Sequence, residues 1–128
     1  MSEITMAFDF GTTKIGVAVG QKITGTATPL SIVPARDGIP DWEAMDRLIE
    51  EWQPKEFVVG LPINMDGTES DMSLAAEKFS RRLHGRYNIP AHLMDERLST
   101  FEAKSYDGDP GQVDAIAAKL ILESWLAT

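Results

Sequence analysis

The spacing of apolar residues changes about a third of the way along the chain, and this change most constrains the fold. From Ile4 to Phe10, apolar side chains alternate with other side chains at a period of two, which is typical of a β-strand. Turn signals at residues 11–13 and 20–22 divide the following stretch, up to Val33, into two further strands. We therefore predict a three-stranded meander over the first third of the chain.

The rest of the chain alternates between helical and strand patterns. The run Phe57–Leu61 is apolar throughout, as in a strand buried on both faces of a sheet. A meander followed by crossover helices predicts an α/β fold, with a mixed five-stranded sheet and helices on both faces. The 128 residues are enough for one domain only, spanning residues 1–128. Helices are expected from Asp41 to Pro54, from about Met72 to Gly85, from Ser99 and from Val113, and later strands over residues 57–61 and 89–94.

Composition excludes several classes of protein. The chain has no cysteine, which excludes disulfide bonds, thiolate metal sites and a cysteine nucleophile. No apolar run approaches the roughly 20 residues that span a bilayer. The first ten residues lack the basic and apolar regions of a signal peptide. We therefore expect a cytoplasmic protein with no membrane partner.

The net charge of −8, from 20 acidic and 12 basic residues, argues against a broad nucleic-acid-binding surface. Affinity for phosphates comes mainly from lysine and arginine. The basic cluster Arg81, Arg82 and Arg86 falls on the second expected helix. A solvated helix face explains most clusters of this kind, and a track for phosphates is the alternative.

Acidic residues stand where two of the expected strands end. Asp9 closes the first strand on its polar face, and Asp95 and Glu96 close the last strand. Ligands of open α/β sheets collect at the carboxyl ends of the strands. Because adjacent strand residues point to opposite faces, at most one of Asp95 and Glu96 faces a site shared with Asp9.

A third acid, Asp114, stands in the first turn of the last expected helix, next to its apolar face. The helix dipole alone would favour an acid there, but an acid that looks toward a sheet needs a partner. Three carboxylates in a chain with no cysteine and two histidines favour Mg²⁺ or Mn²⁺ over zinc. The turn Gly11–Lys14 offers backbone, hydroxyl and ammonium groups to a phosphate, although a polar β-turn has the same composition.

Four motifs occur in order: DFGTTKIGVA from Asp9, GLPINMDGTE from Gly60, DERLST from Asp95 and VDAIAA from Val113. Together they closely resemble the YqgF family of bacterial proteins, which is also described as Holliday-junction-resolvase-like or as pre-16S rRNA nucleases. The resemblance covers nearly the whole chain. It implies a ribonuclease-H-like fold and a cytoplasmic nuclease that matures the 5′ end of 16S ribosomal RNA. The implied partners are pre-16S rRNA or branched DNA, together with ribosomal particles; the oligomeric state is left open.

The resemblance also implies roles for individual residues. The family's acidic positions, expected to be catalytic and to bind Mg²⁺ or Mn²⁺, are matched by Asp9, Glu96 and Asp114. Motif positions that contact substrate are matched by Lys14, Asn64 and Arg97. In a ribonuclease-H-like sheet the last strand lies two places from the first. Asp9 and Glu96 therefore start about 10 Å apart at the backbone, and their side chains must converge.

Other functions fit parts of the pattern. The Asp-x-Gly-Thr-Thr sequence from Asp9 to Thr13 also resembles the first phosphate loop of sugar kinases and actin-like ATPases. Those enzymes need a second domain and a second glycine-rich loop, for which the chain has no room. A non-catalytic ribosome-assembly or recombination factor is a further alternative, against which the three intact acids argue. RNA and junction DNA present the same phosphodiester, so a Holliday-junction resolvase stays open.

Overall fold

The computed structural model describes residues 3–62, 70–95 and 113–128. In these ranges a six-stranded sheet has the order β4-β3-β2-β1-β5-β6. The short helix expected from Ser99 lies outside the described residues. The elements in chain order are β1 (Ile4–Asp9), β2 (Lys14–Gln21), β3 (Thr26–Arg36), β4 (Ile39–Pro40), α1 (Trp42–Trp52), β5 (Glu56–Leu61), α2 (Asp71–Tyr87), β6 (Ala91–Asp95) and α4 (Val113–Leu126).

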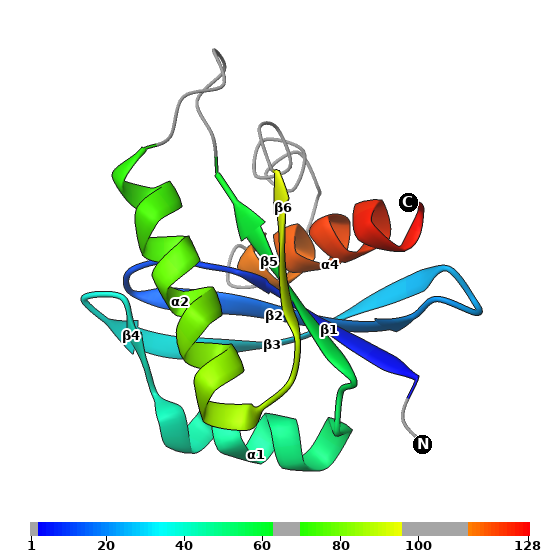
Figure 1. Ribbon diagram of the computed structural model, residues 1–128, viewed down its shortest axis with the longest axis horizontal. Helices are drawn as coiled ribbons and strands as arrows, with labels where there is room; N and C mark the ends of the chain where they lie inside the picture. The colour runs from blue at the N-terminus through cyan, green and yellow to red at the C-terminus, as the bar shows by residue number, and fades with distance from the viewer. Residues whose placement is uncertain (1–2, 63–69, 96–112) are drawn as a thin grey trace.

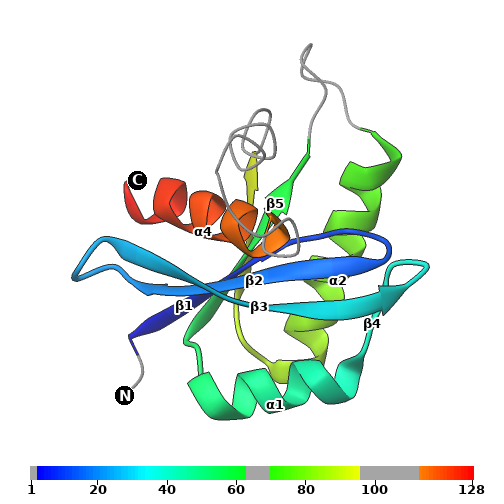
Figure 2. The ribbon, with the colours of Figure 1, turned by 180° about the vertical axis from the view of Figure 1, so that it is seen from behind.

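The sheet is mixed, as predicted. The pairs β1–β2, β2–β3 and β3–β4 are antiparallel, whereas β1–β5 and β5–β6 are parallel. Helices α1 and α2 cover one face and α4 covers the other (Figures 1 and 2). Because β1, β5 and β6 run in the same direction, their carboxyl ends meet at one edge of the sheet. The last strand, β6, lies two places from β1, which is the separation that the ribonuclease-H-like order requires.

The sheet has one short edge strand more than the five strands predicted. β3 continues past Val33 and forms a hairpin with β4 around Asp37 and Gly38, whose φ angles are 51° and 80°. A two-residue hairpin of this kind needs positive φ at both central positions, and Asp-Gly is the sequence that favours it. Pro40 therefore belongs to the strand, and the predicted helix begins after it.

Local capping signals set the ends of α1 and α2. Asp41 caps α1 as predicted, with its side chain accepting hydrogen bonds from the Glu43 and Ala44 amides. Ser70 caps α2 in a reciprocal capping box with Ser73. The described helices include none that is both long enough and apolar enough to cross a membrane.

The two faces of β2 differ in the size of their side chains. Ile15, Val17 and Val19 pack into the larger core beneath α1 and α2. Residues 16, 18 and 20 alternate with them and are glycine or alanine, so the opposite face is nearly flat and α4 lies close against it. The predicted central strand is confirmed, because Phe57, Val58 and Val59 of β5 are fully buried between the two helical layers.

Candidate active site

Asp9 is the last residue of β1 and lies opposite Gly16 of β2 in the antiparallel register. Residues directly opposite each other in such a pair project to the same face, with Cα atoms about 4.5–5.5 Å apart. The Asp9 side chain therefore projects toward α4, on the face that also carries Ala7. Asp9 is partly buried.

Gly16 brings the start of α4 to this position. A Cβ atom placed on Gly16 would overlap the carbonyl group of Asp114 and lie 2.7 Å from the amide nitrogen of Ala115. The first turn of α4 thus rests directly on the Gly16 backbone, next to Asp9. Asp114 itself keeps 30% of its side chain exposed. Two acids from opposite ends of the chain consequently share one face at the carboxyl edge of the sheet.

Lys14 places a positive charge at the same point. It is the first residue of β2, two positions before Gly16, and therefore lies on the α4 face. Its Nζ is 3.8 Å from Oδ2 of Asp114, and 55% of the side chain is exposed. An ion pair this exposed adds little stability. The ion pair matters for ligand binding instead, because it places an exposed ammonium group beside the carboxylates, where that group can contact a negatively charged ligand.

The turn between Asp9 and Lys14 is held by the β3–β4 hairpin. The carbonyl of Thr12 accepts a hydrogen bond from the Gly38 amide at 3.0 Å, and the carbonyl of Thr13 accepts one from the Ala35 amide at 2.9 Å. These bonds fix the backbone that joins the two charged residues. The hydrogen bonds come from the end of β3 and from the turn before β4, so the hairpin that the sequence analysis missed supports the candidate site.

The far end of α4 is fixed by a second set of contacts. The ring of Trp125 stacks on His92 of β6 at 4.8 Å between centroids. His92 Nε2 lies 3.2 Å from a carboxylate oxygen of Glu56, and the other oxygen of Glu56 accepts a hydrogen bond from the buried Thr5 hydroxyl at 3.0 Å. These contacts fix α4 against the sheet near both of its ends, and with it the backbone that carries Asp114.

Of the two adjacent acids predicted to close the last strand, the structure describes Asp95, which is the last residue of β6. It pairs with Leu61 of β5, whose side chain belongs to the core beneath α1 and α2. Asp95 therefore projects to the face opposite Asp9 and Asp114, although it lies at the same edge of the sheet. Glu96 and Arg97 are outside the described residues.

Asn64 is also outside the described residues, but both ends of its segment are placed. The hydroxyl groups of Ser70 and Ser73 donate hydrogen bonds to the Pro62 carbonyl. These bonds hold the start of α2 against the end of β5. The segment that carries Asn64 therefore leaves and rejoins the described chain at the carboxyl edge.

Two of the three predicted metal ligands, Asp9 and Asp114, thus share one face. Within residues 3–62, 70–95 and 113–128, no group of three or more histidine, aspartate or glutamate side chains gathers around a point. Carboxylates from separate elements, accessible and beside a small-residue surface, are the oxygen donors that Mg²⁺ and Mn²⁺ prefer. The described pair therefore fits part of a divalent-metal site, to which a third ligand must be added.

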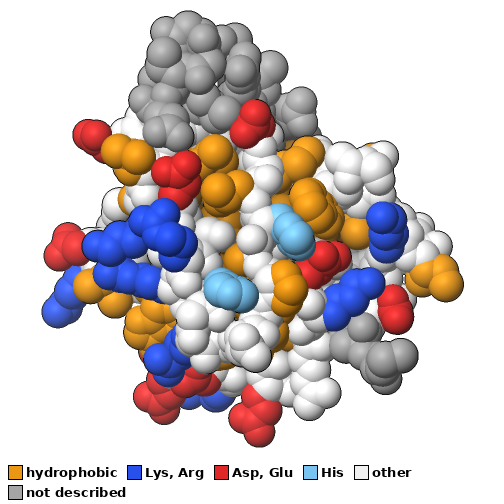
Figure 3. All heavy atoms as spheres, in the orientation of Figure 1, with side chains coloured by type: hydrophobic (Ala, Val, Ile, Leu, Met, Phe, Trp, Pro, Cys, Tyr) orange, Lys and Arg blue, Asp and Glu red, His pale blue; other side chains and the backbone are white. Residues whose placement is uncertain are grey.

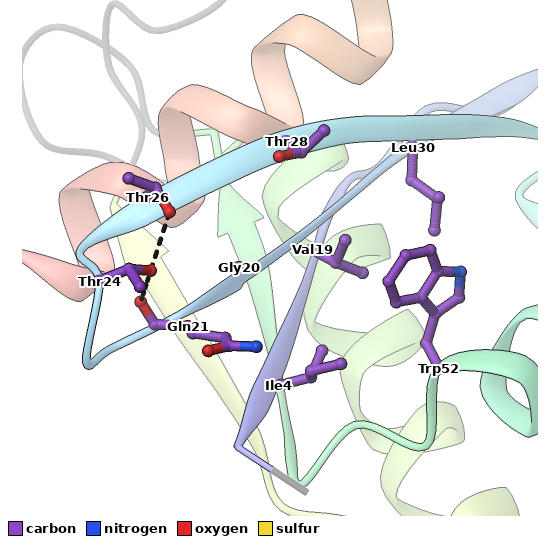
Figure 4. A pocket seen from close by; sticks show the side chains of 9 residues that line it. All are labelled: Ile4, Val19, Gly20, Gln21, Thr24, Thr26, Thr28, Leu30 and Trp52. Atoms are coloured by element: carbon purple, nitrogen blue, oxygen red, sulfur yellow. Dashed lines mark hydrogen bonds between the residues drawn. The ribbon is translucent and has the colours of Figure 1, made fainter.

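A hollow in the described surface lies away from these carboxylates. Figure 4 shows Ile4, Val19, Leu30 and Trp52 gathered on one side of it, with threonines on the other. Ile4 begins β1, whereas Asp9 ends it, so the hollow and the acids are at opposite ends of the strand. The hollow contains no acidic residue and forms no part of the candidate site.

Gly16 is the residue that the sequence analysis missed. The signal was present as the alternation of Ile15, Val17 and Val19 with glycine or alanine, which marks one face of the strand for close approach by another element. What the signal did not reveal is that the approaching element is the helix that carries Asp114.

This sheet order, with helices on both faces, defines a ribonuclease-H-like fold. Thermus thermophilus RuvC in complex with a Holliday junction substrate has the same fold, with a TM-score of 0.55 and 14% identity over 96% of this chain and 92% of that chain. The Fowlpox virus resolvase in complex with Holliday junction DNA matches with a TM-score of 0.54 and 12% identity over 97% of both chains.

The chain belongs to the RuvX family, described as Holliday junction resolvase, whose family model matches residues 3–128. Relatives named as candidate pre-16S rRNA nucleases include one from Azotobacter vinelandii, 54% identical over 97% of this chain and 93% of the relative. Another, from Salmonella paratyphi B, is 53% identical over 98% of this chain and 96% of the relative. The family resemblance and the ribonuclease-H-like fold inferred from the four motifs are thereby confirmed.

Proposed function

We propose that this protein is a nuclease that hydrolyses phosphodiester bonds with Mg²⁺ or Mn²⁺ and matures the 5′ end of pre-16S ribosomal RNA. The observation that carries the proposal is the placement of Asp9 and Asp114 on one face of the carboxyl edge through Gly16. The names of relatives more than 50% identical over nearly their whole length support the RNA substrate. The protein acts as one nuclease domain in the cytoplasm, on RNA within ribosomal precursor particles.

The reaction requires a water molecule to add to phosphorus while the bond from phosphorus to the leaving ribose oxygen breaks and that oxygen takes up a proton. Asp9 and Asp114 are assigned as ligands of the divalent cation, and Glu96 as the third. The choice of Glu96 is supported by the orientation of Asp95, which projects to the other face. A bound divalent cation lowers the pKa of water and offsets the negative charge that develops on the phosphate.

Substrate contacts are assigned to Lys14, Asn64 and Arg97. Lys14 is supported by its position, because its ammonium group stands 3.8 Å from Asp114 and is more than half exposed. A phosphate bound beside the carboxylates would lie next to this ammonium group. The assignment of Asn64 and Arg97 rests on the sequence motifs.

The test is cleavage of a pre-16S RNA fragment in Mg²⁺, in Mn²⁺ and in a chelator. Asp9→Asn and Asp114→Asn are expected to abolish cleavage without changing the temperature of unfolding, because they remove a charge but keep the shape of the side chain. Asp95→Asn is the matched control, since Asp95 lies at the same edge but on the other face. Cleavage that persists in Asp9→Asn would remove Asp9 from the mechanism.

A four-way DNA junction in the same assay tests the second candidate, a Holliday-junction resolvase. The description of the family and the fold shared with two resolvases favour this candidate. If the junction is cut and the RNA is not, then junction DNA is the substrate and the assignment to ribosomal RNA is wrong. The three acid variants should behave in the same way on either substrate, because the bond that is broken is the same.

A further inference from the structure

The C-terminal half of α2 concentrates positive charge on an acidic protein. Residues 78–86 hold four of the 12 lysines and arginines in the chain and no acid, whereas the whole chain has a net charge of −8. Figure 3 shows lysine and arginine side chains gathered over α2. The basic residues are Lys78, Arg81, Arg82 and Arg86.

Arg86 forms an ion pair with Asp46, so its charge is not available to a ligand in the way that those of Lys78, Arg81 and Arg82 are. Its Nε and a terminal nitrogen donate hydrogen bonds to the two carboxylate oxygens of Asp46 in α1, at 3.0 and 2.8 Å. Its guanidinium also lies 4.9 Å from the centre of the Trp42 ring. The hydrogen bond from Arg86, followed by that from Tyr87, lowers the pKa of Asp46 to about 2. Arg86 thus ties α2 to α1, and its charge is compensated.

The other three side chains form a stripe on the outer face of α2. Lys78, Arg81 and Arg82 are spaced i, i+3 and i+4, which places them on one side of a helix. The inward face carries Phe79 and Leu83, which are buried in the core. In the part of the chain that the structure describes, none of the three stripe residues forms an ion pair, even though Glu77 precedes Arg81 by one turn.

The spacing of the stripe matches a phosphate backbone. Lys78 and Arg82 are four residues apart, which is about 6 Å along the helix axis. Successive phosphates of one nucleic-acid strand are about 3.4 Å apart along the duplex axis, so the stripe faces two or three of them. Three neighbouring cations on one helix of an acidic protein, with no ion pair among the described residues, are suited to a polyanion, because like charge repels that ligand from much of the remaining surface.

We propose that Lys78, Arg81 and Arg82 bind the phosphate backbone of the nucleic-acid substrate at a distance from the bond that is cut. This inference rests on the proposed function for the identity of the ligand. α2 begins after Ser70, next to the end of β5, and Lys78 follows eight residues later, about 12 Å along the helix. The stripe lies on the side of the sheet away from α4 and Asp114 (Figures 1 and 2). A substrate must therefore pass around the carboxyl edge to reach both.

This geometry predicts that the stripe acts on long or branched substrates and not on short ones. An oligonucleotide that covers only the carboxylates ends before α2. A duplex arm or a structured RNA extends past the edge and reaches the stripe. The stripe therefore contributes to affinity and to KM for the longer substrate, while kcat is set by the carboxylates.

The test compares two triple variants that each change the net charge from −8 to −11 by removing three basic residues. The first is Lys78→Ala, Arg81→Ala, Arg82→Ala. The control is Lys22→Ala, Arg47→Ala, Lys55→Ala, which removes exposed bases from the β2–β3 turn, from α1 and from the start of β5. Affinity for a structured pre-16S RNA fragment and for a four-way junction is measured over a series of salt concentrations.

The stripe variant is expected to bind about tenfold more weakly at low salt, with a slope of log affinity against log salt that is lower by about two to three. The control variant is expected to bind as the wild type does. Both should bind a short oligonucleotide equally. Arg81→Ala alone, at an exposed position, repeats the comparison if the triple variant does not fold.

Equal affinity and equal slope for the two triple variants would overturn the inference, as would a wild-type protein that binds neither ligand. The proposed function fails separately. Binding that depends on the stripe without any cleavage would support the inference and refute the nuclease assignment. Normal cleavage with no difference between the triple variants would refute the inference and leave the nuclease assignment intact.

Discussion

Replacement of Gly16 by alanine tests the packing that joins the two carboxylates. In most strands, alanine in place of an interior glycine stabilises the fold by about 0.5–1 kcal/mol. At this position the added Cβ would overlap the Asp114 carbonyl and stand 2.7 Å from the Ala115 nitrogen, where ordinary contacts begin at 3.4 Å. The first turn of α4 must therefore withdraw by at least the 0.7 Å difference between these two distances, and further at the carbonyl.

Overpacking of this kind costs about 1–3 kcal/mol. For a chain of this size each kcal/mol lowers the unfolding temperature by roughly 4 °C, so we expect a decrease of about 4–12 °C. The displacement also moves Asp114 away from Asp9 by about 1 Å, and misplacement on that scale costs about 100-fold in rate. Both effects should be seen at once, by thermal denaturation and by cleavage of the RNA fragment well below the unfolding temperature.

Leu122→Ala separates the two effects. Leu122 is fully buried at the far end of α4, and its truncation is expected to cost about 2–5 kcal/mol without pushing on the first turn. It should therefore lower the unfolding temperature but retain the cleavage rate. Gly16→Ala with wild-type stability would refute the close approach of α4. Gly16→Ala that is destabilised but cleaves normally would refute the claim that this approach positions Asp114.

Three further predictions concern the scaffold. Because the pKa of Asp46 is lowered from 3.8 to about 2 in the fold, chiefly by the Arg86 hydrogen bond, its stabilising effect is complete above pH 3.8 and is lost as the pH falls toward 2. Asp46→Asn should thus unfold at a lower temperature than wild type above pH 5, and the difference should shrink between pH 4 and 2. Gly85→Ala should stabilise α2 by about 0.5–1 kcal/mol in denaturant titrations, since a Cβ there meets nothing within 4 Å. Its control, Gly25→Ala, should destabilise the protein instead, because Gly25 has a φ of +66°, which alanine adopts only with strain. Ser73→Ala removes one of the two hydroxyl donors to the Pro62 carbonyl and should cost about 0.5–1.5 kcal/mol, whereas Thr24→Ala, at an exposed hydroxyl, should change stability less.

Elements with a strong local pattern could be predicted closely from the sequence. The alternation in β1, the apolar run in β5 and the Asp41 cap of α1 each depend on neighbours within a few residues. β4 was missed although its Asp37-Gly38 turn is also local, because the strand beyond the turn has only two residues. The boundaries of α2 shifted by one or two residues, since its two caps lie just outside the periodic apolar pattern.

The sequence could predict at which edge of the sheet the acids lie, but not to which face each side chain projects. Parallel strands must end at one edge, so the positions of Asp9 and Asp95 at strand ends were enough to place acids there. The sequence did not show that Asp95 projects away from Asp9. That depends on the register of β6 against β5, which the packing of Leu61 settles.

The basic residues of α2 also separate into what helical spacing predicts and what only the tertiary contacts decide. The sequence grouped Arg86 with Arg81 and Arg82 because the three are neighbours on one helix. In the fold Arg86 turns to Asp46 on a different helix, and Lys78 takes its place beside the other two. A partner 40 residues away cannot be read from helical spacing, because the approach of α1 to α2 is set by the core between them.

The sequence by itself determined most of the secondary structure, the edge at which Asp9 and Asp95 lie and, through four ordered motifs, the family. These follow from local periodicity, from the direction of the strands and from the order of residues along the chain. The tertiary structure alone decided that Asp114 rests on Gly16 beside Asp9, and that Arg86 pairs with Asp46 while Lys78, Arg81 and Arg82 form no ion pair with any residue that the structure describes. Those outcomes depend on how closely a helix can approach a sheet or another helix. That distance is set by the packing of side chains that are far apart in the sequence.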